Sequence, residues 1–484
     1  MSESRTTRRR FLEASAAAAA LAATGSSDRA LAAADGPNVV VIVIDTLRTD
    51  HVYGSRARTP NMDELLRSGL RFTRAYPEAM PTVPVRNALL SGRRQFPFRG
   101  WHDHRGLLNQ PGWEPIDNVR SAFTTALHRA GYWTAYATDN PFLGYAGPYE
   151  RLRESFDAFA RRGGQLGVVR HPSTVSNAEL RSWLHPGRAD RDATARVRRY
   201  LANGRYSHDE SKSWAAQVFS DGARLLEIGA RKRPFALVVD TFQPHEPWTP
   251  PDKYLKLYAD PREFAREPAL PRYGRTDYLK GRNRRRVVDR IRALYAAELT
   301  MTDRWLGTFL DRLHELNLED DTVIALVGDH GFYLGERGWT GKISTELHPE
   351  LTRVPMVLVD PRGRRAGGST SYFASPHDIG PTLLSMAGVR VPAAMDGVDL
   401  SPLLAGGSPP PRPYAYGGYK NSFYIRTDRW ALSGLNRGSD FQLYDLRKDR
   451  GERNNLASSH PRKVRQLYGV VRKQAGGRLP HYDT

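Results

Sequence analysis

Val39-Val-Val-Ile-Val-Ile44, followed directly by Asp45, is the stretch that decides the fold of this chain. An unbroken run of β-branched residues indicates a strand buried on both faces, as in a parallel sheet covered by helices. A second apolar run, Thr322-Val-Ile-Ala-Leu-Val-Gly328, leads into Asp329-His330-Gly331. Ligands of open α/β sheets bind at the carboxyl ends of the strands, so two strands that end in carboxylate and imidazole predict one metal site there.

Strand patterns alternate with helical patterns along most of the chain. Apolar residues recur at helical spacing over residues 288–316, for example. This alternation predicts an α/β fold with a large, doubly wound, mostly parallel sheet and helices on both of its faces. The strands expected are 38–44, 132–138, 235–240, 322–328 and 354–359, and the helices expected are 61–69, 288–316 and 378–387.

The C-terminal part has a different pattern. Gly406-Gly-Ser-Pro-Pro-Pro-Arg-Pro413 marks a linker. Short Tyr-rich segments beyond it predict a small antiparallel sheet, followed by a helix from about residue 461. We therefore expect a catalytic domain at 35–405 and a small α+β subdomain at 413–484, with strands at 413–418, 421–426, 429–434 and 441–446.

Residues 1–34 are predicted to be an export signal outside the fold. Thr7-Arg8-Arg9-Arg10-Phe11-Leu12 precedes an Ala-rich run, which is typical of a twin-arginine signal peptide. The apolar run is too short and too weakly apolar for a membrane span. The pattern predicts export to the periplasm or the extracellular space, and a basic disordered tail is the alternative.

The chain is strongly basic and contains no cysteine. Its formal net charge is +20, from 72 Lys and Arg against 52 Asp and Glu. We interpret this as a solvated, Arg-rich surface, and the alternative is steering of anionic esters. No nucleic-acid-binding motif accompanies the charge, so nucleic acid is not an expected partner. The absence of cysteine suits a compartment in which thiols oxidise.

Three further motifs lie in a fixed order. Thr82-Val-Pro-Val-Arg-Asn-Ala-Leu-Leu-Ser-Gly92 stands between the two strands, Phe242-Gln-Pro-His-Glu-Pro-Trp248 follows, and Gly341-Lys342 comes after the second strand. With the two strand ends, this order resembles the sulfatases, hydrolases of the alkaline phosphatase superfamily, over roughly residues 37 to 460. Where a sulfatase has a Cys or Ser that is oxidised to formylglycine, this chain has Thr82.

The resemblance implies a site with one divalent metal ion and a small anionic ester as substrate. Sulfatases usually have a second acid where this chain has Thr46 and an Asn where it has His330, as phosphonate and phosphodiester hydrolases of the family do. An imidazole and one carboxylate fewer favour Mn²⁺ over Ca²⁺ or Mg²⁺ without excluding them. The expected metal ligands are Asp45, Thr82, Asp329 and His330, and the expected catalytic residues are Thr82, Arg86, His245 and Lys342.

Each catalytic residue has an expected role. Pro84 suits the first turn of a helix, so Thr82 would lie at a helix N-terminus, where an alkoxide is stabilised. Arg86, one turn later, would neutralise that alkoxide or bind a non-bridging oxygen, or else make a structural ion pair. By resemblance, His245 donates to the ester, and Lys342 neutralises the transferred group or protonates the leaving oxygen.

Two points in the site stay open. The Lys and His that sulfatases usually carry after the strand at 132–138 are missing, so Asn140 or an inserted Arg would bind the oxyanion. Asp240 and His245 would hold a second metal in a two-metal alternative.

Thr82 also bears on the reaction. A formylglycine hydrate has two hydroxyls, and the second expels sulfate by elimination. Thr has one hydroxyl, so a sulfated Thr has no such route, whereas a phosphorylated Thr is open to in-line displacement. The sequence predicts a hydrolase that favours phosphate or phosphonate esters. A sulfate ester hydrolase without formylglycine, a phosphotransferase and a catalytically silent binding protein are the alternatives.

Overall fold

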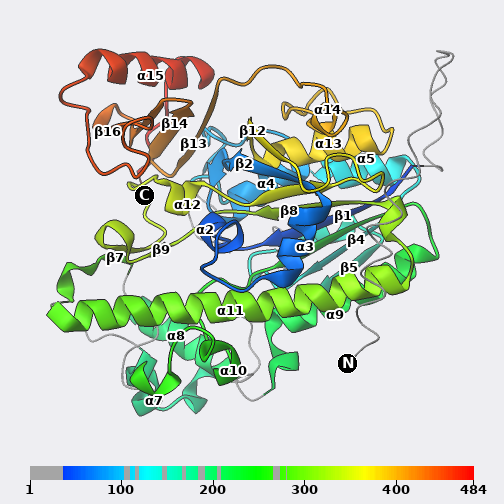
Figure 1. The fold of residues 1–484 in the computed structure, drawn as a ribbon, viewed down its shortest axis with the longest axis horizontal. Helices are drawn as coiled ribbons and strands as arrows, with labels where there is room; N and C mark the ends of the chain where they lie inside the picture. The colour runs from blue at the N-terminus through cyan, green and yellow to red at the C-terminus, as the bar shows by residue number, and fades with distance from the viewer. Residues whose placement is uncertain are drawn as a thin grey trace.

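The protein consists of a large α/β part with a smaller sheet at one end (Figure 1). The predicted export signal lies outside the residues that the structure describes. In this computed structural model, those residues are 36–102, 110–114, 119–143, 150–165, 171–183, 191–203, 209–264, 273–279 and 281–483.

The large sheet has eight strands in the order β12-β2-β11-β8-β1-β6-β4-β5. Its centre is β1 (Asn38–Ile44), which pairs in parallel with β6 (Phe235–Thr241) and β8 (Thr322–Gly328). Strand β11 (Met356–Val359) is antiparallel to both of its neighbours, so the sheet is mostly parallel, as predicted. The remaining strands are β2 (Leu70–Ala75), β4 (Trp133–Thr138), β5 (Ala158–Arg161) and β12 (Ser369–Ala374).

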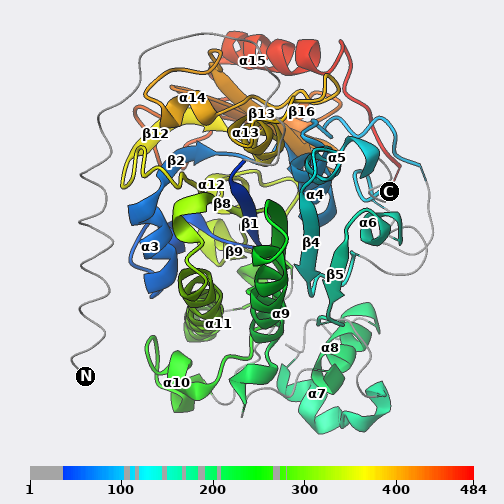
Figure 2. The same ribbon diagram turned by 90° about the vertical axis from the view of Figure 1, so that its right-hand side faces the viewer.

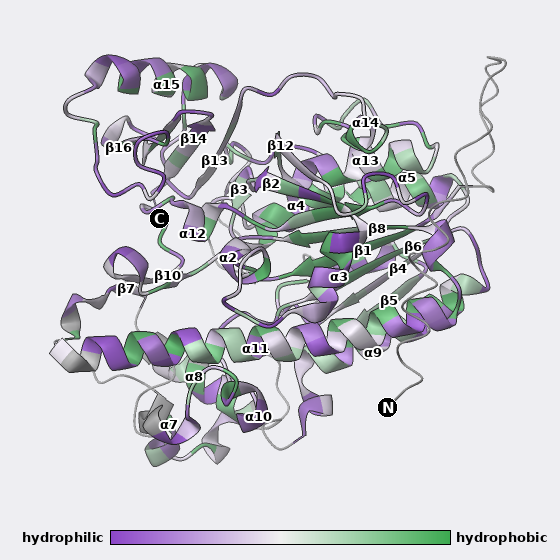
Figure 3. Cartoon of the chain, in the orientation of Figure 1, coloured by the Kyte–Doolittle hydropathy of each residue, from purple (hydrophilic) through white to green (hydrophobic). Residues whose placement is uncertain are grey.

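Helices cover both faces of this sheet (Figure 2). The side chains of β1 divide between the two faces: Val40, Ile42 and Ile44 belong to one hydrophobic cluster, and the alternate valines of the strand belong to the other. Burial on both sides explains the continuous apolar run, and Figure 3 shows the same hydrophobic character along the central strands. The helices are α3 (Pro60–Ser68), α9 (Trp214–Ala230) and α11 (Gly281–Glu315) on the first face, and α4 (Thr82–Ser91), α5 (Phe123–Arg129) and α13 (Ile379–Met386) on the second.

The smaller sheet is antiparallel and carries helix α15 (Pro461–Gln474), as predicted. Its fifth strand is β3 (Ala79–Met80), which comes from the large part and pairs in parallel with β13. The segment directly before Thr82 is therefore held by the small sheet. The domain boundary at residues 405–413 stays a prediction. The other four strands are β13 (Tyr414–Tyr419), β14 (Ser422–Thr427), β15 (Trp430–Leu435) and β16 (Ser439–Asp445).

Short elements complete the described part of the chain. A three-stranded sheet has the order β7-β10-β9, and its middle strand β10 ends directly before Lys342. Within the described residues, no helix combines the length and apolarity needed to cross a membrane. The short helices are α2 (Thr49–Val52), α6 (Glu150–Glu154), α7 (Asn177–Trp183), α8 (Arg191–Asn203), α10 (Asp252–Leu255), α12 (Pro349–Thr352) and α14 (Ser401–Leu404), and the short strands are β7 (Gly274–Arg275), β9 (Tyr333–Leu334) and β10 (Trp339–Gly341).

Candidate metal and catalytic site

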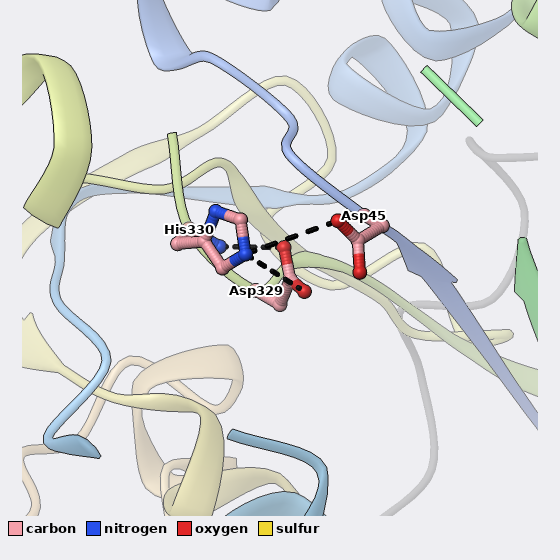
Figure 4. A group of neighbouring side chains, drawn as sticks. All are labelled: Asp45, Asp329 and His330. Carbon is pink, nitrogen blue, oxygen red and sulfur yellow. Dashed lines mark hydrogen bonds and ion pairs between the residues drawn. The ribbon is translucent and has the colours of Figure 1, made fainter. Parts of the chain in front are cut away.

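The two central strands bring their terminal acids together. Ile44 and Gly328 are register partners in the parallel pair of β1 and β8, so Asp45 and Asp329 follow at the same edge of the sheet. Figure 4 shows both carboxylates and the imidazole of His330 converging. One donor atom from each side chain lies within 4.8 Å of the others, and all three residues are fully buried.

The donor set fits a divalent cation. Nε2 of His330 lies 3.8 Å from Oδ1 of Asp45 and 3.6 Å from Oδ2 of Asp329, which leaves room for an ion between them. Oδ2 of Asp45 is buried and accepts no hydrogen bond among the described residues, although Nη1 of Arg86 lies 3.2 Å away as an ion-pair partner. Because Arg86 is shared among three acids, a cation would compensate the buried carboxylate oxygens further. Two carboxylates and one imidazole suit Mn²⁺, Mg²⁺ or Ca²⁺.

The imidazole of His330 is held in a form that can bind a metal. Nδ1 lies 2.9 Å from the carbonyl oxygen of Gly331, which assigns the ring proton to Nδ1 and leaves the lone pair of Nε2 free. Burial lowers the pKa of His330 to about 4, so the ring is neutral at physiological pH. Orientation through the second nitrogen is the usual arrangement for a metal-binding histidine.

The pKa values of the two buried carboxylates shift in opposite directions. Burial, together with the neighbouring Asp329, raises the pKa of Asp45 well above its ordinary range. Burial also acts to raise the pKa of Asp329, but His330 and Arg86 outweigh it and lower that pKa to about 2. Without a cation, the two carboxylates therefore hold a proton to a higher pH than two separate aspartates would.

The chain directly after β1 holds both carboxylates. The backbone N–H of Thr46 donates to Oδ1 of Asp329 over 2.8 Å, and its hydroxyl donates to Oδ1 of Asp45 over 2.7 Å. Thr46 has a φ of 58°, which is uncommon for a β-branched residue. The hydroxyl of Tyr295 donates to the carbonyl of Thr46 over 2.8 Å and stabilises this turn.

Thr82 is the first residue of α4 and is buried at the donor cluster. Its Oγ1 lies 3.4 Å from Nε2 of His330. Pro84 stands in the first turn, as expected from the sequence, so the Thr82 hydroxyl lies at the positive end of the helix. The structure thus brings Thr82 together with Asp45, Asp329 and His330.

Arg86 is fully buried and makes ion pairs with three acids. Nε and Nη2 donate to both oxygens of Asp240 over 2.8 and 2.7 Å. Nη1 donates to Asp329 over 2.5 Å and to the Thr82 carbonyl over 3.1 Å, and it lies 3.2 Å from Oδ2 of Asp45. The sequence allows two roles for Arg86, a structural ion pair and binding of a substrate oxygen. This arrangement corresponds to the structural ion pair.

His245 and Lys342 meet although they lie far apart in the chain. Nζ of Lys342 lies 2.6 Å from Nε2 of His245, and Nδ1 of the same ring lies 2.7 Å from the Glu246 carbonyl oxygen. This pattern assigns the ring proton to Nδ1, so Nε2 accepts from the ammonium group. The ring of Phe242 stacks on the imidazole at 4.0 Å. Lys342 also acts electrostatically on Asp45 and His330, so its charge faces the donor cluster.

Asn140 and Asp139 lie buried at the end of β4. Oδ1 of Asn140 accepts from the N–H of Phe142 over 3.0 Å, while its Nδ2 has no hydrogen-bond partner among the described residues. Asp139 accepts from the N–H of Phe242 over 2.7 Å, and burial raises the pKa of Asp139 to about 7. Asn140 therefore keeps a free donor, but no described contact joins it to the donor cluster.

Sequence reasoning misses the partners of the site residues. From the sequence, Asp240 is expected only as a ligand of a second metal. In the structure, its carboxylate accepts hydrogen bonds from Arg86 and, over 2.8 Å, from the Tyr136 hydroxyl. Asp45, Asp329 and His330 form the one group of three metal-donor side chains that the described residues contain. Tyr136 and Glu246 carry no signal in the sequence beyond their strand and loop positions.

Comparison with known proteins gives a consistent family match. The profile of the sulfatase family matches residues 37–389, and that of the C-terminal region of N-sulphoglucosamine sulphohydrolase matches residues 335–473. An arylsulfatase of Clostridium perfringens is 25% identical, over 92% of this chain and 96% of its own length. A multifunctional alkaline phosphatase superfamily protein of Trinickia caryophylli, PehA, is also 25% identical, over the same shares.

Solved structures show the same fold. The phosphonate monoester hydrolase of Silicibacter pomeroyi superposes with a TM-score of 0.69 at 20% identity, over 92% of this chain and 96% of that chain. The phosphonate monoester hydrolase of Agrobacterium radiobacter gives 0.67 at 22% identity, over 91% of this chain and 95% of that chain.

Proposed function

Because the chain belongs to the sulfatase family, within the alkaline phosphatase superfamily, we propose that it is a metal-dependent hydrolase of small anionic esters that uses Thr82 as an unmodified nucleophile. We further propose that it acts on phosphate or phosphonate esters in preference to sulfate esters. The observation that carries the proposal is the Thr82 hydroxyl, buried at a helix N-terminus and 3.4 Å from Nε2 of His330.

The metal site of this proposal consists of Asp45, Asp329, His330 and Thr82. A bound divalent cation would supply Lewis-acid stabilisation of negative charge and favour ionisation of the Thr82 hydroxyl. The helix dipole of α4 acts in the same direction, since the hydroxyl lies at the N-terminus. Arg86 holds the carboxylates of the site and the first turn of α4 in place.

The reaction has two displacements at phosphorus. Oγ1 of Thr82 loses its proton to solvent and attacks phosphorus, the P–O bond to the alcohol breaks, and the departing oxygen takes a proton from the Lys342 ammonium group. Water then attacks the phosphorylated Thr82 and gives one proton to Lys342, while the bond from phosphorus to Oγ1 breaks and Oγ1 takes a proton from solvent, which restores the hydroxyl. His245 holds Lys342 in place, because its Nε2 accepts a hydrogen bond from the ammonium group.

The single hydroxyl of Thr82 supports phosphorus over sulfur. A sulfated Thr82 lacks the second hydroxyl that would expel sulfate, and direct hydrolysis of an alkyl sulfate is slow. The chain contains no cysteine, so no cysteine-derived formylglycine forms. Relatives named as phosphonate monoester hydrolases share the fold, which supports the same assignment.

Hydrolysis of sulfate esters is the second candidate, favoured by the arylsulfatase relative that matches 92% of this chain. In that case water attacks sulfur directly and Thr82 acts only as a ligand. Two further candidates are a phosphotransferase, which passes the group to an alcohol, and a catalytically silent scaffold.

Matched chromogenic esters test the proposal. The p-nitrophenyl sulfate, phosphate monoester, phosphate diester and phenylphosphonate are compared with Mn²⁺, Mg²⁺ or Ca²⁺ added to the metal-depleted protein. A phosphorus ester is expected to exceed the sulfate ester in kcat/KM, and intact-protein mass is expected to show unmodified Thr82. A higher kcat/KM for the sulfate ester would assign the chain to the second candidate, and inactivity on all four would favour the silent scaffold.

We also propose export by the twin-arginine pathway. The support is the sequence Arg8-Arg9-Arg10-Phe11-Leu12 before an Ala-rich run. This pathway carries folded proteins, which suits a site whose ligands come from distant parts of the chain.

A further inference from the structure

Asp240 has an unusually complete set of partners for a residue that does not face the donor cluster. It lies near the end of β6, where its register partners are Val43 on β1 and Thr138 on β4. Its side chain is fully buried and accepts from Nε and Nη2 of Arg86 over 2.8 and 2.7 Å. The hydroxyl of Tyr136 donates to the same carboxylate over 2.8 Å. Three donors hold the Asp240 carboxylate in a fixed orientation.

Arg86 stands between Asp240 and the donors for the cation. Its Nη1 lies 2.5 Å from Oδ2 of Asp329 and 3.2 Å from Oδ2 of Asp45. A guanidinium at this distance cancels one negative charge of the two carboxylates and repels a divalent cation. The imidazole of His330 is neutral and adds no charge. Asp240 cancels the charge of Arg86 from its other side, so with Asp45 ionised, the form that binds a cation, the cluster as a whole keeps two net negative charges.

We propose that Asp240 is a positioning residue of the metal site: it neutralises and orients Arg86, and thereby leaves Asp45 and Asp329 with the charge that a divalent cation requires. This inference rests on one part of the proposed function, namely that a divalent cation binds the site. Cation binding is measured without any ester, so failure of the ester chemistry and failure of this inference are distinguishable.

The first experiment removes the charge of Asp240 and keeps its shape. Asp240→Asn and the wild-type protein are depleted of metal with a chelator and titrated with Mn²⁺ and with Ca²⁺ by calorimetry. We expect Kd to rise at least about tenfold for the variant, the range found when residues behind metal ligands are replaced. Unchanged Kd values would overturn the proposal, as would a wild-type protein that binds neither ion.

Asp378→Asn is the matched control. Asp378 is fully buried and makes the same two-pronged pair with Arg412, over 2.6 and 2.7 Å, outside the donor cluster. This variant is expected to lower the melting temperature and leave both Kd values unchanged. If it weakens cation binding as much as Asp240→Asn does, general destabilisation explains both variants and the proposal fails.

Thr46 allows the lost charge to be supplied from another residue. Its hydroxyl lies 2.7 Å from Oδ1 of Asp45, and its φ of 58° is a conformation that Asp adopts more readily than Thr. The double variant Thr46→Asp, Asp240→Asn is expected to recover the wild-type Kd to within about threefold. A double variant no better than Asp240→Asn would refute the charge argument. If Asp240→Asn does not fold, Thr46→Asp alone decides: it is expected to tighten Kd, and an unchanged or weaker Kd overturns the inference.

Discussion

At pH values below the raised pKa of Asp45, binding of a cation should release one proton from this protein. In the cation-free site, burial and the neighbouring Asp329 raise the pKa of Asp45 well above its ordinary range. Asp329 has a pKa of about 2 and His330 one of about 4, so neither carries a proton to be displaced above pH 5. A divalent cation binds the ionised form of Asp45, and the proton on that residue must leave when the ion enters.

The size of the pH effect on cation affinity follows from the release of one proton per ion. Between pH 5 and the raised pKa of Asp45, each fall of one pH unit should weaken the apparent Kd tenfold, or about 1.36 kcal/mol. Above that pKa, Asp45 is already ionised and Kd should stop changing with pH. Affinity therefore rises with pH and then levels. A slope of two would require a second proton to leave. The lowered pKa values of Asp329 and His330 exclude those two residues as its source, so a slope of two would assign the second proton to the Thr82 hydroxyl.

Calorimetry with Mn²⁺ in two buffers of different ionisation enthalpy counts the released protons directly. We expect close to one proton per ion where the pH lies below the raised pKa of Asp45, and progressively fewer as the pH rises through it. Asp139, whose pKa burial raises to about 7, is the nearby acid that could contribute instead. Asp139→Asn should leave the proton count unchanged. No proton release at any pH above the ordinary titration range of an aspartate, or a count that disappears in Asp139→Asn, would refute this reasoning.

Four further predictions concern catalysis, stability and export. Thr82→Ala should lower kcat/KM of the best ester by about three orders of magnitude or more in steady-state assays, whereas Thr82→Ser should retain most of it. Lys342→Gln should lower kcat about 10²-fold or more for alkyl leaving groups and far less for p-nitrophenol, since it removes the proton donor. Glu452→Gln should destabilise the protein by about 3–5 kcal/mol in urea unfolding, because Arg426 and its partner Glu452 are both buried, 2.7 Å apart. Against the effect of burial, the Arg426 charge lowers the pKa of Glu452 to about 2. The stability that this ion pair contributes is therefore present above the ordinary pKa of Glu and is lost as the pH falls through 2. Changing Arg8 and Arg9 together to Lys should retain the protein in the cytoplasm on cell fractionation, and unaltered export would show that the signal was misinterpreted.

The central sheet and the metal donors could be predicted because their signals are local. The apolar run before Asp45 and the one before Asp329 each specify a buried parallel strand, and such strands end at one edge of a sheet. Pro84 specified the helix that begins at Thr82 in the same way. Each inference needed only a few consecutive residues and one rule of chain geometry.

Strands and helices with mixed composition escaped prediction. In β2, Arg71 and Arg74 stand beside buried Leu70 and Phe72, so the strand carries no continuous apolar run. It lies next to the edge strand β12, where long charged side chains reach solvent. Helix α9 buries small residues such as Ala215 and Gly222 against the sheet, and these give a weak helical pattern.

The partner of Arg86 could not be predicted for a different reason. Asp240 is separated from Arg86 by 154 positions, and its side chain reaches the guanidinium only because β6 pairs with β1 in the observed register. A shift of one residue would turn Asp240 to the opposite face of the sheet. Ion pairs between distant elements depend on register, and a single sequence does not specify it.

The ion pairs of Arg86 also restrict which charge an incoming ester can carry. Since Asp240, Asp329 and Asp45 already surround the guanidinium, Lys342 is, among the site residues that the structure describes, the cationic side chain left to face the substrate, and it makes no described ion pair with an acid. A divalent cation would balance the two net negative charges of the buried cluster, and Lys342 then balances one further negative charge. A singly charged ester, such as a phosphonate monoester or a phosphate diester, enters with its charge compensated. A doubly charged phosphate monoester would bring an uncompensated charge into a buried site. Under the proposed function, we therefore expect the singly charged phosphorus esters to have the higher kcat/KM.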